Sequence, residues 1–180
     1  FNNNCFINGS NNEIANGVDN AIALGVGGKS NRQGELVLGG GLNAVPVGGE
    51  SAVVTESDRK VSIVNLSGAT TDNTATTLSV NGVSAFDYIN VNLNSIVGFE
   101  IYITRLEVGG TSGVAGNYSY RNIKGVVRID NAGAMLFVVG YTRNIAKYDS
   151  GGGSGVNGTA VMVDSTTGGV PSISIQVTDR

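Results

Sequence analysis

The chain has 180 residues, of which 11 are basic and 14 acidic, and its formal net charge is −3. The length allows one domain or two small ones. The low basic content, without any block of basic residues, argues against nucleic acid as a partner, and no apolar run is long enough to predict membrane insertion. Glycine contributes 28 residues, roughly twice its usual share, and tryptophan is absent. This composition predicts an all-β fold with many tight turns.

A short unit of two or three apolar residues followed by glycine recurs at the start of the chain. Its copies end at Gly9, Gly17, Gly25 and Gly39, so the first three are eight residues apart and the last follows after fourteen. Such a unit is too short for a helix, and a short period is typical of a roll in which each strand stacks on the next. One copy of residues 1–45 would bury too little surface to be stable alone. We therefore expect a β-roll that associates with identical chains.

Two segments of this repeat region carry a family resemblance. Residues 21–25 read Ala-Ile-Ala-Leu-Gly, and residues 34–39 read Gly-Glu-Leu-Val-Leu-Gly, with Gly-Lys-Ser at 28–30 between them. This pattern resembles the head repeats of trimeric adhesins of the YadA type, which also occur in bacteriophage tail fibres. The resemblance covers about forty residues and implies a homotrimeric roll. The eight-residue spacings depart from the fourteen-residue repeat of that family.

We predict a connector at residues 46–60, because proline, paired glycines and a cluster of charges interrupt the repeat there. Residues 61–180 then predict an antiparallel β-sandwich of jelly-roll type. Phe99, Ile101 and Ile103 alternate with polar residues, which indicates a half-buried strand. The apolar run 135–139 predicts a central strand covered on both faces. The expected strands are 61–66, 75–80, 84–93, 97–108, 118–129, 134–144, 159–164 and 172–178.

The second region also resembles a known module. Residues 70–78 read Thr-Thr-Asp-Asn-Thr-Ala-Thr-Thr-Leu, which looks like the opening T-T-D-A-T-P-T-x-L of a β-sandwich module common in phage tail fibres and related virion proteins. Residues 120–126 are similar to its Y-R-F-E-G-V strand, and residues 159–164 and 168–177 to its late strand pair. The match spans about 110 residues. That module usually ends in a strand bearing tryptophan, which either lies outside this segment or counts against the resemblance; we expect Phe1 and Arg180 to be internal positions of a longer protein.

The residue types argue against catalysis, cofactors and metals. Histidine is absent, so neither a Ser-His-Asp triad nor a Cys-His pair can form, and zinc is improbable with Cys5 as the single cysteine. We expect Cys5 to be a small buried hydrophobe. No segment has the spacing of an EF-hand or of a phosphate-binding loop. The acidic residues are expected on the solvated surface, and we predict no catalytic residue, no cofactor and no metal.

Tyrosine and arginine side chains near the glycine-rich loops are the candidate binding residues. Rigid aromatic side chains are common at binding faces, although tyrosine in strands more often packs at the edge of a core. We expect any receptor contact on loops of the sandwich. The candidate receptor-binding residues are Tyr118, Tyr120, Arg121, Tyr141, Arg143 and Tyr148.

The two resemblances imply a structural and host-attachment segment of a trimeric phage tail fibre or virion appendage. Its expected partners are two further copies of itself, other virion or tail proteins, and a host cell-surface glycan or protein. It would act in the virion, outside the cell, without catalysis. The alternatives are a bacterial trimeric surface adhesin and a non-catalytic part of a polysaccharide-degrading tailspike.

Overall fold

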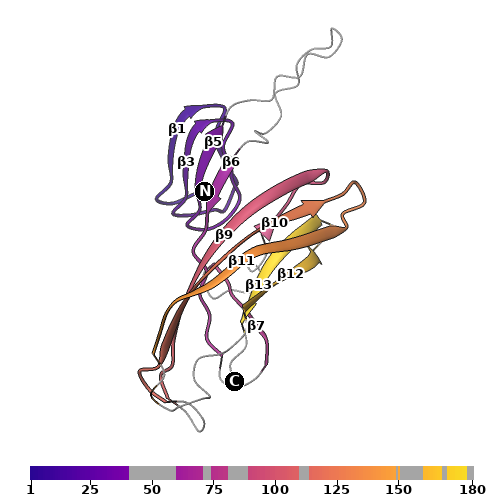
Figure 1. The fold of residues 1–180 in the computed structure, drawn as a ribbon. Helices are drawn as coiled ribbons and strands as arrows, with labels where there is room; N and C mark the ends of the chain where they lie inside the picture. Colours follow the sequence, from indigo (N-terminus) through magenta and orange to yellow (C-terminus); the bar gives the residue numbers. More distant parts are fainter. Residues whose placement is uncertain are drawn as a thin grey trace. The chain divides into compact units, whose positions relative to one another are not determined.

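The computed structural model describes residues 1–40, 60–70, 74–80, 89–109, 114–148, 150, 160–167 and 170–177 (Figure 1). Throughout these ranges the regular structure is β-strand, as the sequence predicts, and no helix there is long and apolar enough to cross a membrane. The chain divides into two compact units. Unit 1 is Phe1–Ser67 with Ser79–Phe86, and unit 2 is Gly68–Leu78 with Asp87–Arg180.

Unit 1 is built on a four-stranded sheet in the order β1-β3-β5-β6. Strands β1 (Phe6–Ser10), β3 (Ile22–Val26) and β5 (Leu36–Gly40) are parallel, and β6 (Lys60–Ile63) runs antiparallel to β5. The register aligns Gly9 with Gly25 and Gly25 with Gly39. Three of the four apolar-glycine units are therefore neighbouring strands of one sheet.

The remaining apolar-glycine unit, which ends at Gly17, lies between these strands in the sequence. Its first residue, Ile14, is the last residue of β2 (Glu13–Ile14), which pairs in parallel with β4 (Lys29–Ser30) in a second, two-stranded sheet. The chain returns to the first sheet after sixteen residues, from Phe6 to Ile22, and again after fourteen, from Ile22 to Leu36. The eight-residue spacing in the sequence is thus half of a sixteen-residue coil.

One corner of each coil requires a left-handed backbone. Asn4, Asn20 and Gly34 have φ values of 53°, 56° and 65°, and they are separated by the same sixteen and fourteen residues as the strands. Asparagine and glycine tolerate this conformation better than other residues. The Asn4 side-chain amide also donates to Asn20 Oδ1 over 3.3 Å. Corners of successive coils are therefore stacked and linked.

The interior of unit 1 is narrow and is filled mainly by small side chains. Ile14, Val18, Ala21 and Ala23 form one buried cluster. Cys5 packs partly buried against it, with its thiol 3.2 Å from the Val18 carbonyl oxygen. This position fits the prediction of a small hydrophobic role for the cysteine.

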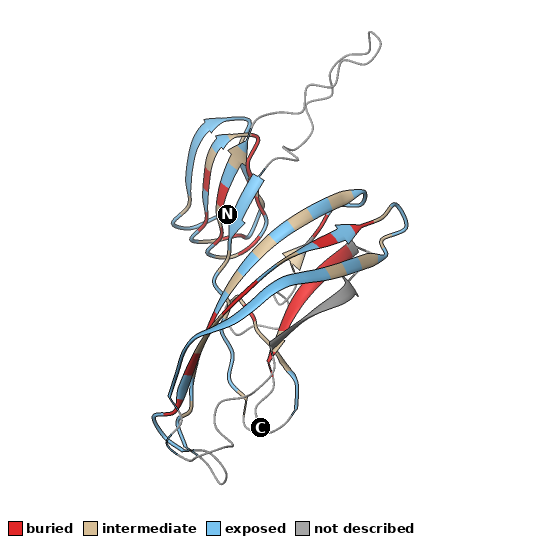
Figure 2. Ribbon diagram, in the orientation of Figure 1, coloured by how far each residue is buried: buried red, intermediate tan, exposed pale blue. Residues whose placement is uncertain are grey.

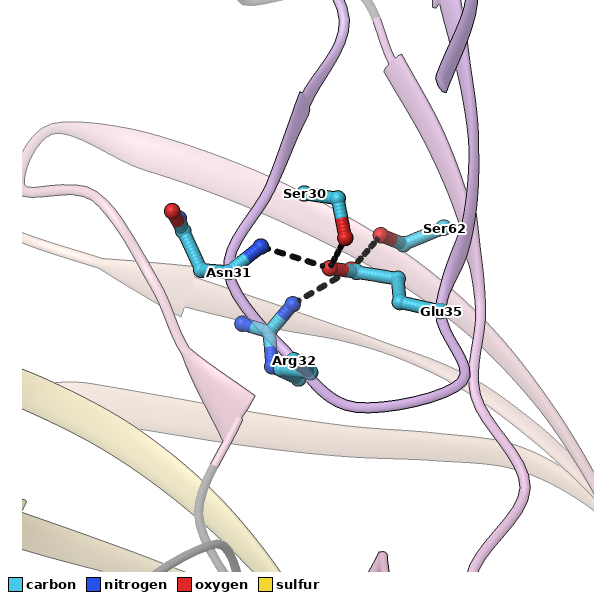
Figure 3. Close-up of polar contacts among 5 residues, drawn as sticks. All are labelled: Ser30, Asn31, Arg32, Glu35 and Ser62. Atoms are coloured by element: carbon cyan, nitrogen blue, oxygen red, sulfur yellow. Dashed lines mark hydrogen bonds and ion pairs between the residues drawn. The ribbon is translucent and has the colours of Figure 1, made fainter. Parts of the chain in front are cut away.

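A carboxylate is also buried in unit 1, contrary to our expectation that the acidic residues lie on the surface. Glu35 is 1% exposed, and Figure 3 shows its oxygens surrounded by donors. Arg32 Nη1 lies 2.6 Å from Oε1, while Ser30 Oγ and the Asn31 backbone nitrogen lie 3.0 and 2.9 Å from Oε2. The Ser62 hydroxyl also donates to Oε1. The carboxylate therefore ties β6 to the turn that precedes β5.

This contact corrects the expected position of one strand. The sequence predicts residues 61–66 as the first strand of the second domain. Instead β6 pairs with β5, matching Leu36 to Ile63 and Leu38 to Val61, and so completes the sheet of unit 1. The pairing with β5 and the Ser62–Glu35 hydrogen bond are the contacts that place this strand in unit 1. The expected connector, apart from Lys60, lies outside the described residues.

Unit 2 contains two sheets of antiparallel strands. The first has the order β11-β10-β9, and its long strands are β9 (Ser95–Leu106), β10 (Tyr118–Ile129) and β11 (Met135–Tyr148). The second has the order β12-β13-β7, with β8 also paired to β13. Its strands are β12 (Ala160–Thr167), β13 (Val170–Val177), β7 (Thr76–Thr77) and β8 (Ile89–Asn90).

The two sheets share one hydrophobic core. Val127 and Ile129 of β10 cluster with Ile173 of β13 and with Val91. Figure 2 shows buried positions on both strands. A core of this kind is how two antiparallel sheets bury their apolar faces together.

The alternation along β9 is confirmed. Ile103 is buried and Phe99 and Ile101 are half-buried, while the polar residues between them are exposed. The prediction for the run 135–139 is wrong. Leu136 and Val138 are 59% and 55% exposed, because they lie on the open face of the sheet, whereas Met135 and Phe137 on the other face pack against the core.

Candidate functional site

Five of the six tyrosines of the chain lie on one face of the sheet β9-β10-β11, which we call the tyrosine face. Alternate residues of a strand point to the same face, and residues paired across strands share it. The register places Tyr118 opposite Tyr148, Lys124 opposite Tyr141, and Asn122 opposite Tyr102 and Arg143. The tyrosines concerned are Tyr102, Tyr118, Tyr120, Tyr141 and Tyr148.

The rings on this face are arranged in pairs. The ring centroids of Tyr118 and Tyr148 are 6.0 Å apart and their planes differ by 21°. Those of Tyr102 and Tyr120 are 6.1 Å apart and tilted by 31°. Both separations lie within the range of favourable aromatic contacts. Four flat rings are thereby held on a solvent-facing surface.

A charged cluster joins these rings at the middle of the face. Glu100 Oε1 accepts hydrogen bonds from Lys124 Nζ at 2.7 Å, from the Tyr102 hydroxyl at 2.5 Å and from Asn122 Nδ2 at 3.1 Å. The three donors lie on β9 and β10, and the register brings them together. The long side chains of Lys124 and Glu100 are therefore held in one geometry.

This cluster shifts the protonation equilibria of its members. The hydrogen bond from Lys124 and then that from Tyr102 lower the pKa of Glu100 below its ordinary value. The hydrogen bond to Glu100 raises the pKa of Tyr102, and the same carboxylate raises the pKa of Lys124. Near neutral pH the face therefore carries an ionised carboxylate, an ammonium group and a neutral phenol.

An open depression adjoins the cluster. It measures about 360 Å³ and is lined by Asn122, Lys124 and Tyr141. Its lining combines one aromatic ring with an amide and a cation. A depression of this size and composition can hold a small polar ligand or one part of a larger one.

The structure groups five of the six candidate binding residues. Tyr118, Tyr120, Tyr141, Arg143 and Tyr148 lie on the tyrosine face, on strands rather than on the loops where we expected the binding residues. Arg121 is different. It pairs with Ile103 and Asn144, so it belongs to the opposite face of the sheet.

Sequence reasoning missed Glu100, Tyr102, Asn122 and Lys124. The signal was present in part, because Glu100 and Tyr102 were placed on the solvent side of β9 by the same alternation that predicted its buried side. The pairing of β9 with β10 was the missing information. Without that register, neither Lys124 nor Asn122 could be assigned to Glu100.

Unit 1 has a second candidate face, the outer side of the sheet β1-β3-β5-β6, which we call the apolar face. Ala23 and Val37 point inward and are fully buried, so the residues on either side of them in each strand point outward. Across the sheet these outward positions form two rows that are apolar except for Asn8. The apolar members are Phe6, Ile22, Leu24, Leu36, Leu38, Val61 and Ile63.

Several side chains of the apolar face are extensively exposed in the single chain. Phe6 is 54%, Leu38 41% and Val61 58% exposed.

No protein-family model, curated protein or solved structure matches the chain.

Proposed function

We propose that the chain is a structural and host-attachment segment of a homotrimeric phage tail fibre or related virion appendage. In this proposal unit 1 is a β-roll through which the chains associate, and unit 2 is a jelly-roll-like β-sandwich that contacts the host surface. The segment acts outside the cell and has no catalytic step. The proposed number of chains, three, comes from the resemblance of residues 21–39 to the head repeats of trimeric adhesins.

The apolar face carries the proposal. Seven apolar side chains lie together on a four-stranded sheet, with neighbouring strands about 4.8 Å apart. Contiguous apolar surface of this kind is uncommon on monomers and marks an interaction site. A second and a third copy of the same sheet, related by a closed rotation axis, would cover it with like surface.

The contacts of unit 1 also support a mechanical role. Each coil hydrogen-bonds to the next through its backbone, and side-chain amides bridge adjacent coils. Asn12, for example, donates to the Gly25 carbonyl oxygen at 2.9 Å and accepts from the Gly28 backbone nitrogen at 2.7 Å. Such stacking stiffens a spacer along its length.

The contacts of several acidic residues support the non-catalytic role in this proposal, because these carboxylates serve as structural hydrogen-bond acceptors. Glu35 is buried with Arg32, and Glu100 accepts three hydrogen bonds. Asp130 Oδ1 accepts from the backbone nitrogens of Ala132 and Ala134 and so closes the turn before β11.

Sedimentation of the full chain at micromolar concentration tests the association. We expect a species of three chains, each of 18.3 kDa. Leu38→Glu should give a folded monomer, because it places a charge at the centre of the apolar face. The control is Ile96→Glu, which introduces the same charge at an exposed apolar position of unit 2 and should leave the trimer intact. A monomeric native chain, or a trimer that tolerates Leu38→Glu, would contradict the proposal.

A further inference from the structure

We propose that the tyrosine face binds a saccharide carrying a carboxylate group, at the depression lined by Asn122, Lys124 and Tyr141. This inference deepens the attachment role and rests on the proposed function. It names the chemical class of the ligand and the residues that contact it.

The rings favour a saccharide over a purely apolar ligand. Tyrosine offers a flat apolar ring and a hydroxyl group at little cost in conformational entropy, which suits a sugar ring with a C–H face and polar edges. Tyr141 borders the depression, and the residue is 42% exposed. An apolar ligand would instead have to cover Lys124 and Glu100, whose charges need hydrogen-bonding partners.

Polar groups beside the ring are already positioned. The second carboxylate oxygen of Glu100, Oε2, makes no hydrogen bond in the described part of the chain, since the three donors all bind Oε1. The Lys124 ammonium group uses one of its three N–H donors for the hydrogen bond to Glu100, which leaves two for a ligand. Adjacent sugar hydroxyls can donate to the free oxygen and accept from the ammonium group. The existing contacts keep both side chains in place before the ligand arrives.

The charge of the face indicates an acidic sugar. Glu100 neutralises Lys124, which leaves Arg143 as the excess charge beside the depression. Arg143 lies opposite Asn122 and two residues beyond Tyr141, about 7 Å along β11. Among the described residues it makes no ion pair or hydrogen bond. A guanidinium group in this setting matches the two oxygens of a carboxylate.

Calorimetric titration of the full chain tests the inference. The probes are uronic-acid and sialic-acid oligosaccharides, each compared with its methyl ester, which differs only in the charge and the ester methyl. We expect at least one acid to bind, at least tenfold more tightly than its ester. Arg143→Gln should reduce the affinity for the acid to that of the ester, and Tyr141→Ala should weaken both.

Arg128→Gln is the matched control. Arg128 is an exposed arginine of the same face, four residues from Lys124 and so about 13 Å along β10. Its loss should leave the affinity unchanged. Absence of binding by every acid up to millimolar concentration would overturn the inference, as would equal binding of acid and ester or an equal effect of Arg128→Gln.

Sedimentation of the same samples separates this inference from the proposed function. A trimer that binds no acidic saccharide contradicts the inference alone. A monomer that binds with the expected selectivity contradicts the trimeric fibre but preserves the site.

Discussion

Arg32 and Glu35 form a buried ion pair of 2.6 Å at the turn before β5, and the Ser62 hydroxyl of β6 donates to the same carboxylate oxygen. The two charged residues are three positions apart in the sequence, whereas Ser62 is 27 positions from Glu35. The pair thus connects a local turn to the antiparallel strand that completes the sheet. Removal of the ion pair should destabilise both the turn and the pairing of β6 with β5.

Glu35→Gln should destabilise unit 1 by about 3–5 kcal/mol, because it breaks the buried ion pair of Glu35 with Arg32. The control is Glu13→Gln, which breaks a more exposed pair with Lys29 of 3.6 Å and should cost no more than about 1 kcal/mol. Urea unfolding followed by the NMR amide signal of Val37, a buried residue of unit 1, measures both changes. Equal costs would show that the buried pair is not the main stabilising contact.

The stability of unit 1 should also fall in acid. Burial alone would raise the pKa of Glu35, but Arg32 and the hydrogen bonds from Ser62, Asn31 and Ser30 lower it below the ordinary value of 4.5. A lowered folded-state pKa gives stability that is complete above about pH 4.5 and is lost as the pH falls through the folded pKa. The urea midpoint of native unit 1 should therefore drop between pH 6 and pH 3 by more than that of Glu35→Gln. A parallel decrease in the two proteins would refute the assignment.

Gly25→Ala should destabilise unit 1 more than Gly34→Ala. Both glycines have positive φ values, 89° and 65°, so alanine at either position carries a backbone cost of about 1–2 kcal/mol. A Cβ atom at Gly25 would in addition lie 2.5 Å from the Gly39 carbonyl oxygen on the next strand, while one at Gly34 would meet nothing within 4 Å. The difference between their unfolding free energies isolates the steric requirement of the stacked glycines. Equal values would mean that β3 and β5 can separate freely.

Ile129→Ala and Ile173→Ala should each destabilise unit 2 by about 2–5 kcal/mol, as buried large-to-small substitutions do. The two residues are 1% and 2% exposed and belong to the cluster shared by both sheets. The double variant should deviate from additivity by about 0.5–3 kcal/mol. Far-ultraviolet circular dichroism during urea unfolding measures these values, with the exposed Ile96→Ala as control. Strict additivity would argue against a common core.

Glu100→Gln should lower the pKa of Tyr102. The carboxylate accepts a hydrogen bond from the Tyr102 hydroxyl and so disfavours loss of the phenolic proton, which holds the pKa of Tyr102 above 10.0 in the native chain. An amide acceptor has no negative charge and should allow the value to fall toward 10.0. The NMR titration of the Tyr102 ring measures the change. Thr104→Ala serves as control, because Thr104 lies on the same side of β9 and is not among the donors to Glu100 in the described part of the chain. An unchanged titration would show that the hydrogen bond does not persist in solution.

The all-β class, the short strands that contain the repeated glycines and the buried side of β9 could all be predicted from the sequence. These properties depend on local causes. Glycine and asparagine permit left-handed corners, and a period of two along a strand assigns each side chain to one of two faces. Residues such as Ile103 therefore could be placed without knowing any strand partner.

Which strands are neighbours could be seen only in the folded chain. Pairing joins β6 to β5 and brings Glu100 beside Lys124, across sequence separations that no local pattern records. Arg121 was misplaced for the same reason, since its neighbour Tyr120 faces the opposite side of the sheet. The apolar face of unit 1 and the tyrosine face of unit 2 both depend on the register between strands, and in each unit that register is set by the burial of the unit's own core.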